Sequence, residues 1–214
     1  MTHTPYSHFG SPWCEKVIDE LNGTAFEIGI ESDKKQRGAA VNVTVCDEDE
    51  NQALFVAQVR KTEFHPRRFN RTRKDYFLCG RNDNGNAFAH PVELTRTNAR
   101  VEVALCRIWQ CTPSQLAKII RQGDVALIPE RALTFRDVEE FTVPEFAVGD
   151  SHIVTAERVY VGRDGVYVAG SRAQIRHTKQ QHPHVAATLS PSKLYRVQLG
   201  IRAETWGFAR PTFD

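Results

Sequence analysis

The histidines of this chain gather toward its C-terminal end. Four of the eight follow residue 150, and three of those lie in the segment RHTKQQHPH, residues 176–184. Neutral imidazole is the most common metal ligand in proteins, because it offers a nitrogen lone pair near neutral pH. The pattern predicts a metal site built on His152, His177 and His182.

Three imidazole ligands with one open coordination position are typical of catalytic zinc, iron or manganese centres. Carboxylates that could complete the ligand set, or orient the imidazole rings, are Asp150, Glu157 and Glu204.

Two other interpretations of the same histidines need no metal. A pair of histidines can serve as general acid and general base on a phosphodiester, with a cation supplied by Arg172 or Arg176. Alternatively, residues 176–184 form an exposed polar loop whose histidines have no chemical role.

A second candidate is a basic cluster in RKTEFHPRRFNRTRKDYF, residues 60–77, where cations alternate with aromatic residues. Arginine and lysine neutralise phosphates, while aromatic faces stack on unpaired bases. We expect residues 64–75 to form a loop that contacts single-stranded nucleic acid or another anionic partner. The candidate contact residues are Arg67, Arg68, Arg71, Arg73 and Lys74. The alternative is a solvated loop whose aromatic side chains turn toward the core.

The composition bounds these functions. Hydrophobic residues make up 41% and charged residues 25% of the 214, which is ordinary for a globular protein, and the net charge is only +2. No apolar run approaches the roughly 20 residues of a membrane helix, and the N-terminus lacks the pattern of a secretory signal. Five cysteines without a CxxC pair argue against a disulfide framework. We therefore expect a soluble cytoplasmic protein that makes no membrane contact.

Hydrophobic periodicity predicts the elements that must position these residues. Residues 13–22 have the apolar spacing of an amphipathic helix, and alternating apolar and polar residues predict strands between residues 24 and 64. A strand over 75–80 and its hairpin partner over 86–94 follow. Two helices are expected over 97–111 and 112–122, the second with a capping box from Thr112 to Gln115.

The rest of the chain returns to strands, with a turn at Arg163 to Gly165. The predicted fold is therefore α+β and β-rich, with two small antiparallel β assemblies joined by a helix pair. We expect an N-terminal α+β part over residues 1–95, a helical connector over 96–122 and a C-terminal β domain over 123–214. The C-terminal part is expected to be barrel-like or cupin-like.

The segments IIRQGDVALIPE, GDSHIVTA and the stretch from VYVAGSRAQIRH to the closing YRV strand resemble a family of uncharacterised bacterial and phage proteins. The resemblance covers roughly residues 76–206. Its pattern falls on Gln122, Gly123, Asp124, His152, His177, His182, Pro183, Tyr195 and Glu204. This sequence departs from the pattern in having Asp-Ser before His152 and a wider spacing of the later histidines. The resemblance implies a fold, a place for the site and an origin in a phage or mobile element, but no activity.

Three functions follow as hypotheses. The first is a histidine-based metal-binding β domain, catalytic or not. The second is a non-enzymatic protein that binds nucleic acid or forms a complex through the basic residues of segment 60–74. The third is a structural module that binds another protein.

Overall fold

The computed structural model describes residues 10–21, 39–63, 71–82, 85–149, 151–178 and 185–200. These residues fall into two compact units. The N-terminal unit runs to Ile108, and the C-terminal unit begins at Trp109. Each unit is built around one antiparallel sheet, so the fold is β-rich and of the α+β kind.

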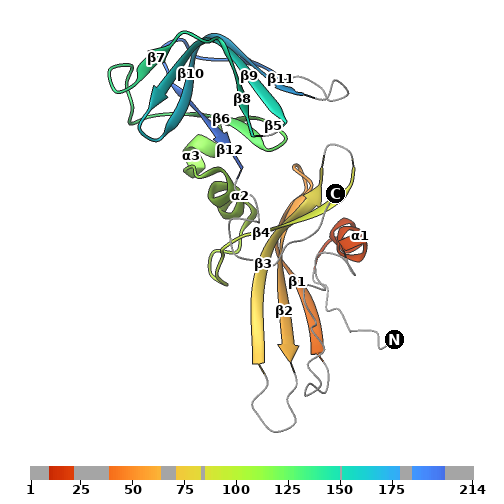
Figure 1. Cartoon of the computed structure of the whole chain (residues 1–214). Helices are drawn as coiled ribbons and strands as arrows, with labels where there is room; N and C mark the ends of the chain where they lie inside the picture. Colours follow the sequence, from red (N-terminus) through yellow and green to blue (C-terminus); the bar gives the residue numbers. More distant parts are fainter. Residues whose placement is uncertain are drawn as a thin grey trace. The chain divides into compact units, whose positions relative to one another are not determined.

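The N-terminal sheet is a four-stranded meander in which each strand pairs with the next one along the chain (Figure 1). Its strands are β1 (Ala39–Asp49), β2 (Leu54–Glu63), β3 (Arg71–Arg81) and β4 (Ala87–Pro91). The strands predicted for β1 and β2 are confirmed. In β1 the alternate residues Val43 and Val45 are buried, whereas the consecutive residues Leu54 to Ala57 of β2 are all buried, so both faces of β2 are covered there. The strand predicted before residue 32 lies outside the described residues.

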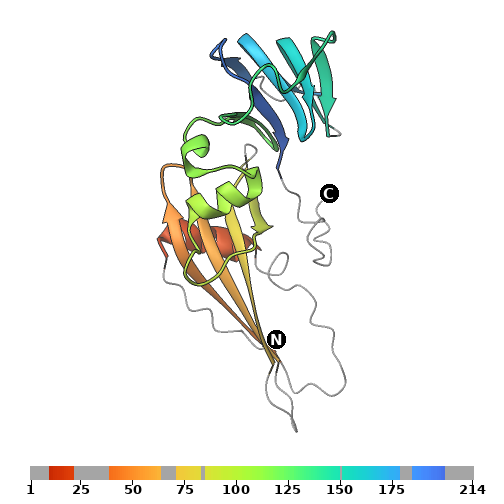
Figure 2. The same ribbon diagram turned by 90° about the vertical axis from the view of Figure 1, so that its left-hand side faces the viewer.

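Two helices accompany this sheet. Helix α1 (Pro12–Leu21) buries the apolar stripe that its sequence predicts, and Val17 and Ile18 of that stripe join the core formed by β1, β2 and β3. Helix α2 (Val101–Trp109) begins where the carboxylate of Asp47 accepts a hydrogen bond of 2.8 Å from the backbone N–H of Val101. Figure 2 shows α1 and α2 on opposite faces of the sheet.

The prediction of a loop over residues 64–75 is wrong for its second part. Residues 71–75 belong to β3, which pairs with β2 in unbroken register from Glu63–Arg71 to Leu54–Gly80. Their dense charge hides the period of the strand, because neither face of this end of the hairpin carries the apolar residues by which a strand is recognised.

The C-terminal sheet has eight strands, and its main path runs β5-β6-β12-β10-β9-β7. Strand β11 pairs with β10 and β8 pairs with β9, and the described strands do not close into a barrel. The strands are β5 (Ile120–Gln122), β6 (Val125–Pro129), β7 (Glu139–Phe141), β8 (Glu145–Val148), β9 (His152–Gly162), β10 (Gly165–His177), β11 (Val185–Thr188) and β12 (Tyr195–Leu199).

The long hairpin of β9 and β10 dominates this sheet. Its two strands are joined at the predicted Arg163–Asp164 turn, and Gly162 pairs with Gly165. Side chains alternate across it, and the inward ones, such as Val154 and Ile175, are fully buried in the core of the unit.

A bulge in β10 interrupts the hairpin between Ala169 and Ala173. Gly170 has a φ of +120° there, and the carboxylate of Glu157 accepts hydrogen bonds from the N–H of Ser171, at 3.0 Å, and from its hydroxyl. These bonds hold the extra residues of β10 in place, as the backbone polar groups of a bulge require partners.

The second predicted helix is shorter than expected. Helix α3 (Pro113–Leu116) has the predicted capping box, in which the Thr112 hydroxyl accepts from Gln115 N–H and the Gln115 side chain accepts from Thr112 N–H. The helix ends after one turn, and Ile120 starts β5 instead of extending a buried helical face. No helix in the described part of the chain is both long enough and apolar enough to span a bilayer.

Candidate functional site

Two of the predicted metal ligands lie directly opposite each other at one end of the β9–β10 hairpin. His152 begins β9, His177 ends β10, and the two are paired in the strand register. Their imidazole rings meet edge to face, with ring centroids 4.9 Å apart and an interplanar angle of 80°. Residues distant in the sequence thus form one histidine pair.

The bulge in β10 creates this pairing. Between the turn and the bulge, Gly165 faces Gly162 and Ala169 faces Arg158, and continuing that register would set His152 against Ile175. Beyond the bulge the register is displaced, and His177 faces His152 instead. The Glu157 contacts that hold the bulge therefore also set the position of the histidine pair.

The pair lies at the margin of the hydrophobic core. His152 and His177 are on the same face of the hairpin as Val154 and Ile175, because side chains two residues apart share a face. His152 is 5% exposed, whereas His177 is partly exposed. One imidazole is thus set within the protein and the other reaches solvent.

The turn between β5 and β6 covers His152. It consists of Gly123 and Asp124, with Gln122 paired to Val125 on either side. Gly123 has a φ of +55°, a left-handed conformation that glycine adopts without the steric cost of a Cβ. The carbonyl of Asp124 accepts a hydrogen bond of 2.7 Å from Gly200 N–H, which fastens the turn to the end of β12.

This turn brings a carboxylate to the buried imidazole. Nδ1 of His152 lies 3.1 Å from Oδ1 of Asp124 and 3.1 Å from the hydroxyl oxygen of Ser151. The other ring nitrogen, Nε2, faces Gly123, where a Cβ atom would stand only 3.3 Å from it. A carboxylate beside one ring nitrogen is an arrangement found in histidines that bind a metal or transfer a proton through the second nitrogen.

The third predicted ligand, His182, lies outside the described residues, as do Asp150 and Glu204. Glu157 accepts hydrogen bonds from Ser171 at the bulge, so it acts on the histidine pair through the strand register and not as a ligand. Among the residues that the structure describes, no group of three or more histidine, cysteine or carboxylate side chains is arranged to hold a metal ion.

The cations suggested for acid–base catalysis point away from the histidine pair. Arg172 and Arg176 alternate with His177 along β10 and so project from the opposite face of the strand. Arg176 forms an ion pair of 2.9 Å with Glu145. Neither arginine is placed to stabilise a charge that develops at His152 or His177.

The predicted basic cluster is only partly described. Arg67 and Arg68 lie outside the described residues, and Arg71 is described through its backbone in β3 alone. Arg73 and Lys74 are exposed on β3, where Arg73 forms an ion pair of 2.9 Å with Asp75.

The β2–β3 pairing places two further cations of the predicted basic segment beside the candidate contact residues. In the register, Arg60 lies opposite Lys74 and Lys61 lies opposite Arg73. Opposed residues share a face of the sheet, so each face of this hairpin end carries a pair of cations.

Sequence reasoning also missed the roles of Asp124 and Ser151 beside His152. Asp124 stands in the RQGD segment on which the family resemblance was based, and that was the only signal available for it. Ser151 carries no signal beyond being the neighbour of His152 in the sequence.

Comparison with known proteins gives no independent guide to this site. The chain matches no protein-family model, and neither a curated protein nor a solved structure is significantly similar to it.

Proposed function

We propose that the C-terminal unit is a histidine-based metal-binding β domain in which His152 and His177 are two of the ligands. The observation that carries this proposal is the pairing of the two imidazoles across β9 and β10, with ring centroids 4.9 Å apart. His182, five residues beyond His177 in the sequence, is the proposed third ligand. The barrel-like or cupin-like character of this part of the chain remains a prediction.

The surroundings of His152 fit a metal ligand. The Asp124 carboxylate at Nδ1 favours a proton on that nitrogen, which leaves the lone pair on Nε2 for a cation. Gly123 keeps the space beside Nε2 free of a side chain. Imidazole ligands suit zinc, iron and manganese, and a bound ion with an open position would activate water or polarise a substrate oxygen.

The protein's own contribution is to orient the imidazole rings and to shield them from water on one side. The rigid β9–β10 register places the rings, Asp124 and Ser151 restrain the orientation of His152, and the core beneath Val154 and Ile175 excludes water from one side. These supports would lower the entropic cost of assembling a site from separate strands.

The test is metal content and metal-dependent stability of the untagged, gel-filtered protein. Elemental analysis should find zinc, iron or manganese near one ion per chain. Chelation with EDTA should lower the melting temperature, because binding to the folded state alone stabilises that state. His177→Ala should lose both the metal and the effect of EDTA.

Two further variants sharpen the result. Asp124→Asn should keep the ligands but weaken metal affinity by about 10- to 100-fold, the usual effect of removing a carboxylate that orients a ligating histidine. His90→Ala, in β4 of the N-terminal unit, is the matched histidine control and should retain the metal. If the melting temperature is the same with and without EDTA, and His177→Ala merely destabilises, the histidine pair is structural and the proposal fails.

A second candidate function rests on the β2–β3 hairpin. The facing pairs Arg60–Lys74 and Lys61–Arg73 concentrate cations at the end that leads into segment 64–70. We propose that this end binds single-stranded nucleic acid without catalysis, with Arg67, Arg68 and Arg71 in the same surface. The alternative use of this surface is docking of an acidic protein.

The nucleic-acid proposal predicts a salt-dependent affinity for a single-stranded oligonucleotide. Changing Arg67, Arg68 and Arg71 to Ala should weaken binding and lower the slope of log affinity against log salt by about one for each phosphate that the variant no longer neutralises. The matched control changes three exposed arginines elsewhere in the N-terminal unit: Arg96, Arg100 and Arg107. Equal affinity and slope in the two triple variants would exclude this surface.

A further inference from the structure

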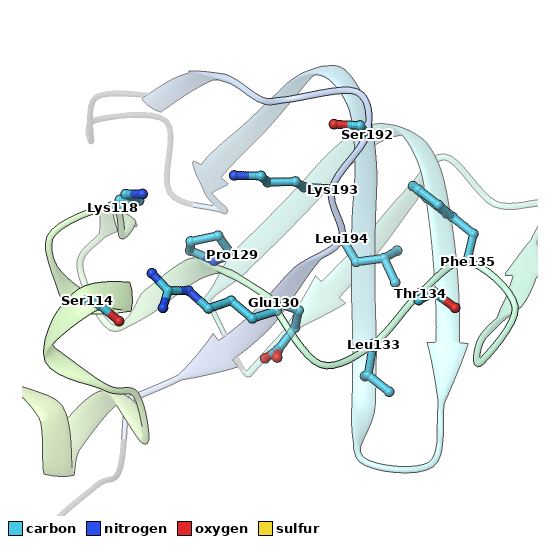
Figure 3. A pocket seen from close by; sticks show the side chains of 11 residues that line it. Ser114, Lys118, Pro129, Glu130, Leu133, Thr134, Phe135, Ser192, Lys193 and Leu194 are labelled. Carbon is cyan, nitrogen blue, oxygen red and sulfur yellow. The ribbon is translucent and has the colours of Figure 1, made fainter.

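A separate cavity lies in the C-terminal unit between α3, the segment that follows β6 and the segment that precedes β12 (Figure 3). Its volume is about 380 Å³, within the range of small-molecule sites and near its lower end. Its lining residues are Ser114, Lys118, Pro129, Glu130, Arg131, Leu133, Thr134, Phe135, Ser192, Lys193 and Leu194. None of the histidine-site residues is among them.

The lining carries an excess of positive charge. Lys118, Arg131 and Lys193 are exposed, and no described residue forms an ion pair with any of them. The acid of the lining, Glu130, is neutralised by an ion pair of 2.9 Å with Arg196, in which both side chains are largely buried. Three cations that face a cavity without a compensating acid favour an anionic ligand.

Two hydroxyl groups extend the polar part of the lining. The Ser114 hydroxyl lies 3.1 Å from that of Thr112, and the Ser192 hydroxyl lies 3.2 Å from that of Ser190. The Ser190 and Ser192 hydroxyls share one hydrogen bond, so one of their two protons remains for donation to a ligand. The Thr112 hydroxyl donates to Oε1 of Gln115, so Ser114 donates to Thr112 and offers a ligand its oxygen lone pair. Hydroxyls beside lysine and arginine are a common environment for phosphate oxygens.

The remainder of the lining is apolar and contains an aromatic ring held in position. Phe135 is 36% exposed, and its ring packs edge to face against Tyr160 with centroids 5.5 Å apart. The guanidinium of Arg158 lies 5.4 Å from the centroid of the Phe135 ring. Leu194, by contrast, is almost fully buried and forms part of the floor.

The polar and aromatic parts occupy different ends of the cavity. Figure 3 shows the side chains of Lys118 and Lys193 extending toward the same side, above Pro129, while Phe135 lies at the other end. A ligand that uses both ends must carry a negative charge on one side and a flat apolar group on the other.

We propose that this cavity binds a small aromatic phosphate ester of about mononucleotide size. The phosphate lies at Lys118, Arg131 and Lys193, and the flat ring lies against Phe135. Arginine and lysine bind phosphate oxygens through charge-assisted hydrogen bonds, and an exposed aromatic ring is the sequence-tolerant partner of a base. The site is distinct from the proposed metal site and requires no metal.

Calorimetric titrations with three probes separate the two halves of the proposal. Adenosine 5′-monophosphate carries both groups, ribose 5-phosphate carries only the anion, and adenosine carries only the ring. The monophosphate should bind at least about tenfold more tightly than either fragment, because base stacking and phosphate contacts each contribute that order of affinity. Equal affinity for the monophosphate and ribose 5-phosphate would overturn the aromatic half.

Variants test which end of the cavity binds the phosphate and which end binds the ring. Lys193→Gln and Lys118→Gln should each weaken binding of the monophosphate, by up to about tenfold, and Phe135→Ala should weaken it while leaving ribose 5-phosphate unchanged. Lys16→Gln, an exposed lysine of α1, is the matched charge control. Circular-dichroism melting of each variant checks the fold. Absence of binding by the folded wild type, or equal binding by the Lys118, Lys193 and Lys16 variants, would overturn the proposal.

Discussion

Replacing Gly170 with alanine tests the claim that the bulge in β10 positions the histidine pair. Gly170 has a φ of +120°, and a Cβ there would stand 2.7 Å from the Cβ of Glu157 and 2.6 Å from its Oε2. The first contact is with an atom next to the backbone, so rotation of the Glu157 side chain cannot relieve it. The bulge must move, and the register that sets His177 against His152 must weaken with it.

The hairpin contains its own control for the size of this effect. Gly165 has a φ of +146°, and a Cβ there would meet no atom within 4 Å. Gly165→Ala therefore introduces backbone strain alone, which costs about 1–3 kcal/mol. Gly170→Ala adds the steric clash, for which forced overpacking suggests about 1–3 kcal/mol more.

Hydrogen exchange of backbone amides, followed by mass spectrometry, is the appropriate assay because it reports β9 and β10 separately from the N-terminal unit. A loss of about 2 kcal/mol accelerates exchange about 30-fold, since RT is about 0.6 kcal/mol. In peptides that contain His152 or His177, the amide exchange rate of Gly170→Ala should exceed that of Gly165→Ala by about that factor. Equal exchange in the two variants would show that the bulge can be rebuilt without its glycine and would refute the reasoning.

Three further predictions follow from individual contacts. Gly123→Ala should destabilise the C-terminal unit by about 1–2 kcal/mol in urea denaturation, because the φ of Gly123, +55°, is left-handed and the new Cβ would crowd Nε2 of His152. An unchanged free energy of unfolding would contradict this crowding. Hydrogen bonds from the Ser171 hydroxyl and N–H hold the pKa of Glu157 below its usual 4.5. The stabilisation by the Glu157 carboxylate is therefore complete above pH 4.5 and is lost as the pH falls through the lowered pKa. The melting-temperature difference between wild type and Glu157→Gln should shrink over that range, and a constant difference would argue against this role. Burial, together with the neighbouring Glu48 carboxylate, raises the pKa of the Cys14 thiol to about 12. Iodoacetamide at neutral pH should therefore alkylate Cys14 in urea but not in the native protein. Rapid labelling of the native protein would count against this environment.

The elements that the sequence determined are those whose signals are local. The apolar stripe of Val17, Ile18 and Leu21 specifies α1, because a period near 3.6 residues produces one buried helical face. Alternation specifies β1 in the same way, with Val43 and Val45 on the buried face. The capping box at Thr112 and Gln115 marks the start of α3, because its hydrogen bonds lie within four consecutive residues.

The site is different because it depends on register and on contacts between distant segments. Histidine spacing singled out His152 and His177, yet their pairing requires a bulge that no local pattern announces, at Gly170. The approach of Asp124 to His152 depends on how β5 and β6 pack against the hairpin. Contacts of this kind depend on how whole sheet faces pack, because a displaced strand register moves every side chain that follows.

The basic segment and the cavity also depend on contacts between distant segments. The charges of Arg73 and Lys74 masked a strand that pairing with β2 stabilises, since β preference depends on the neighbours that a strand finds. The cavity joins Ser114, Phe135 and Lys193 from three separate segments. Residue types alone determined which groups were available for chemistry, and only the tertiary structure decided which of them meet, because long-range strand pairing sets distances that composition and local period leave open.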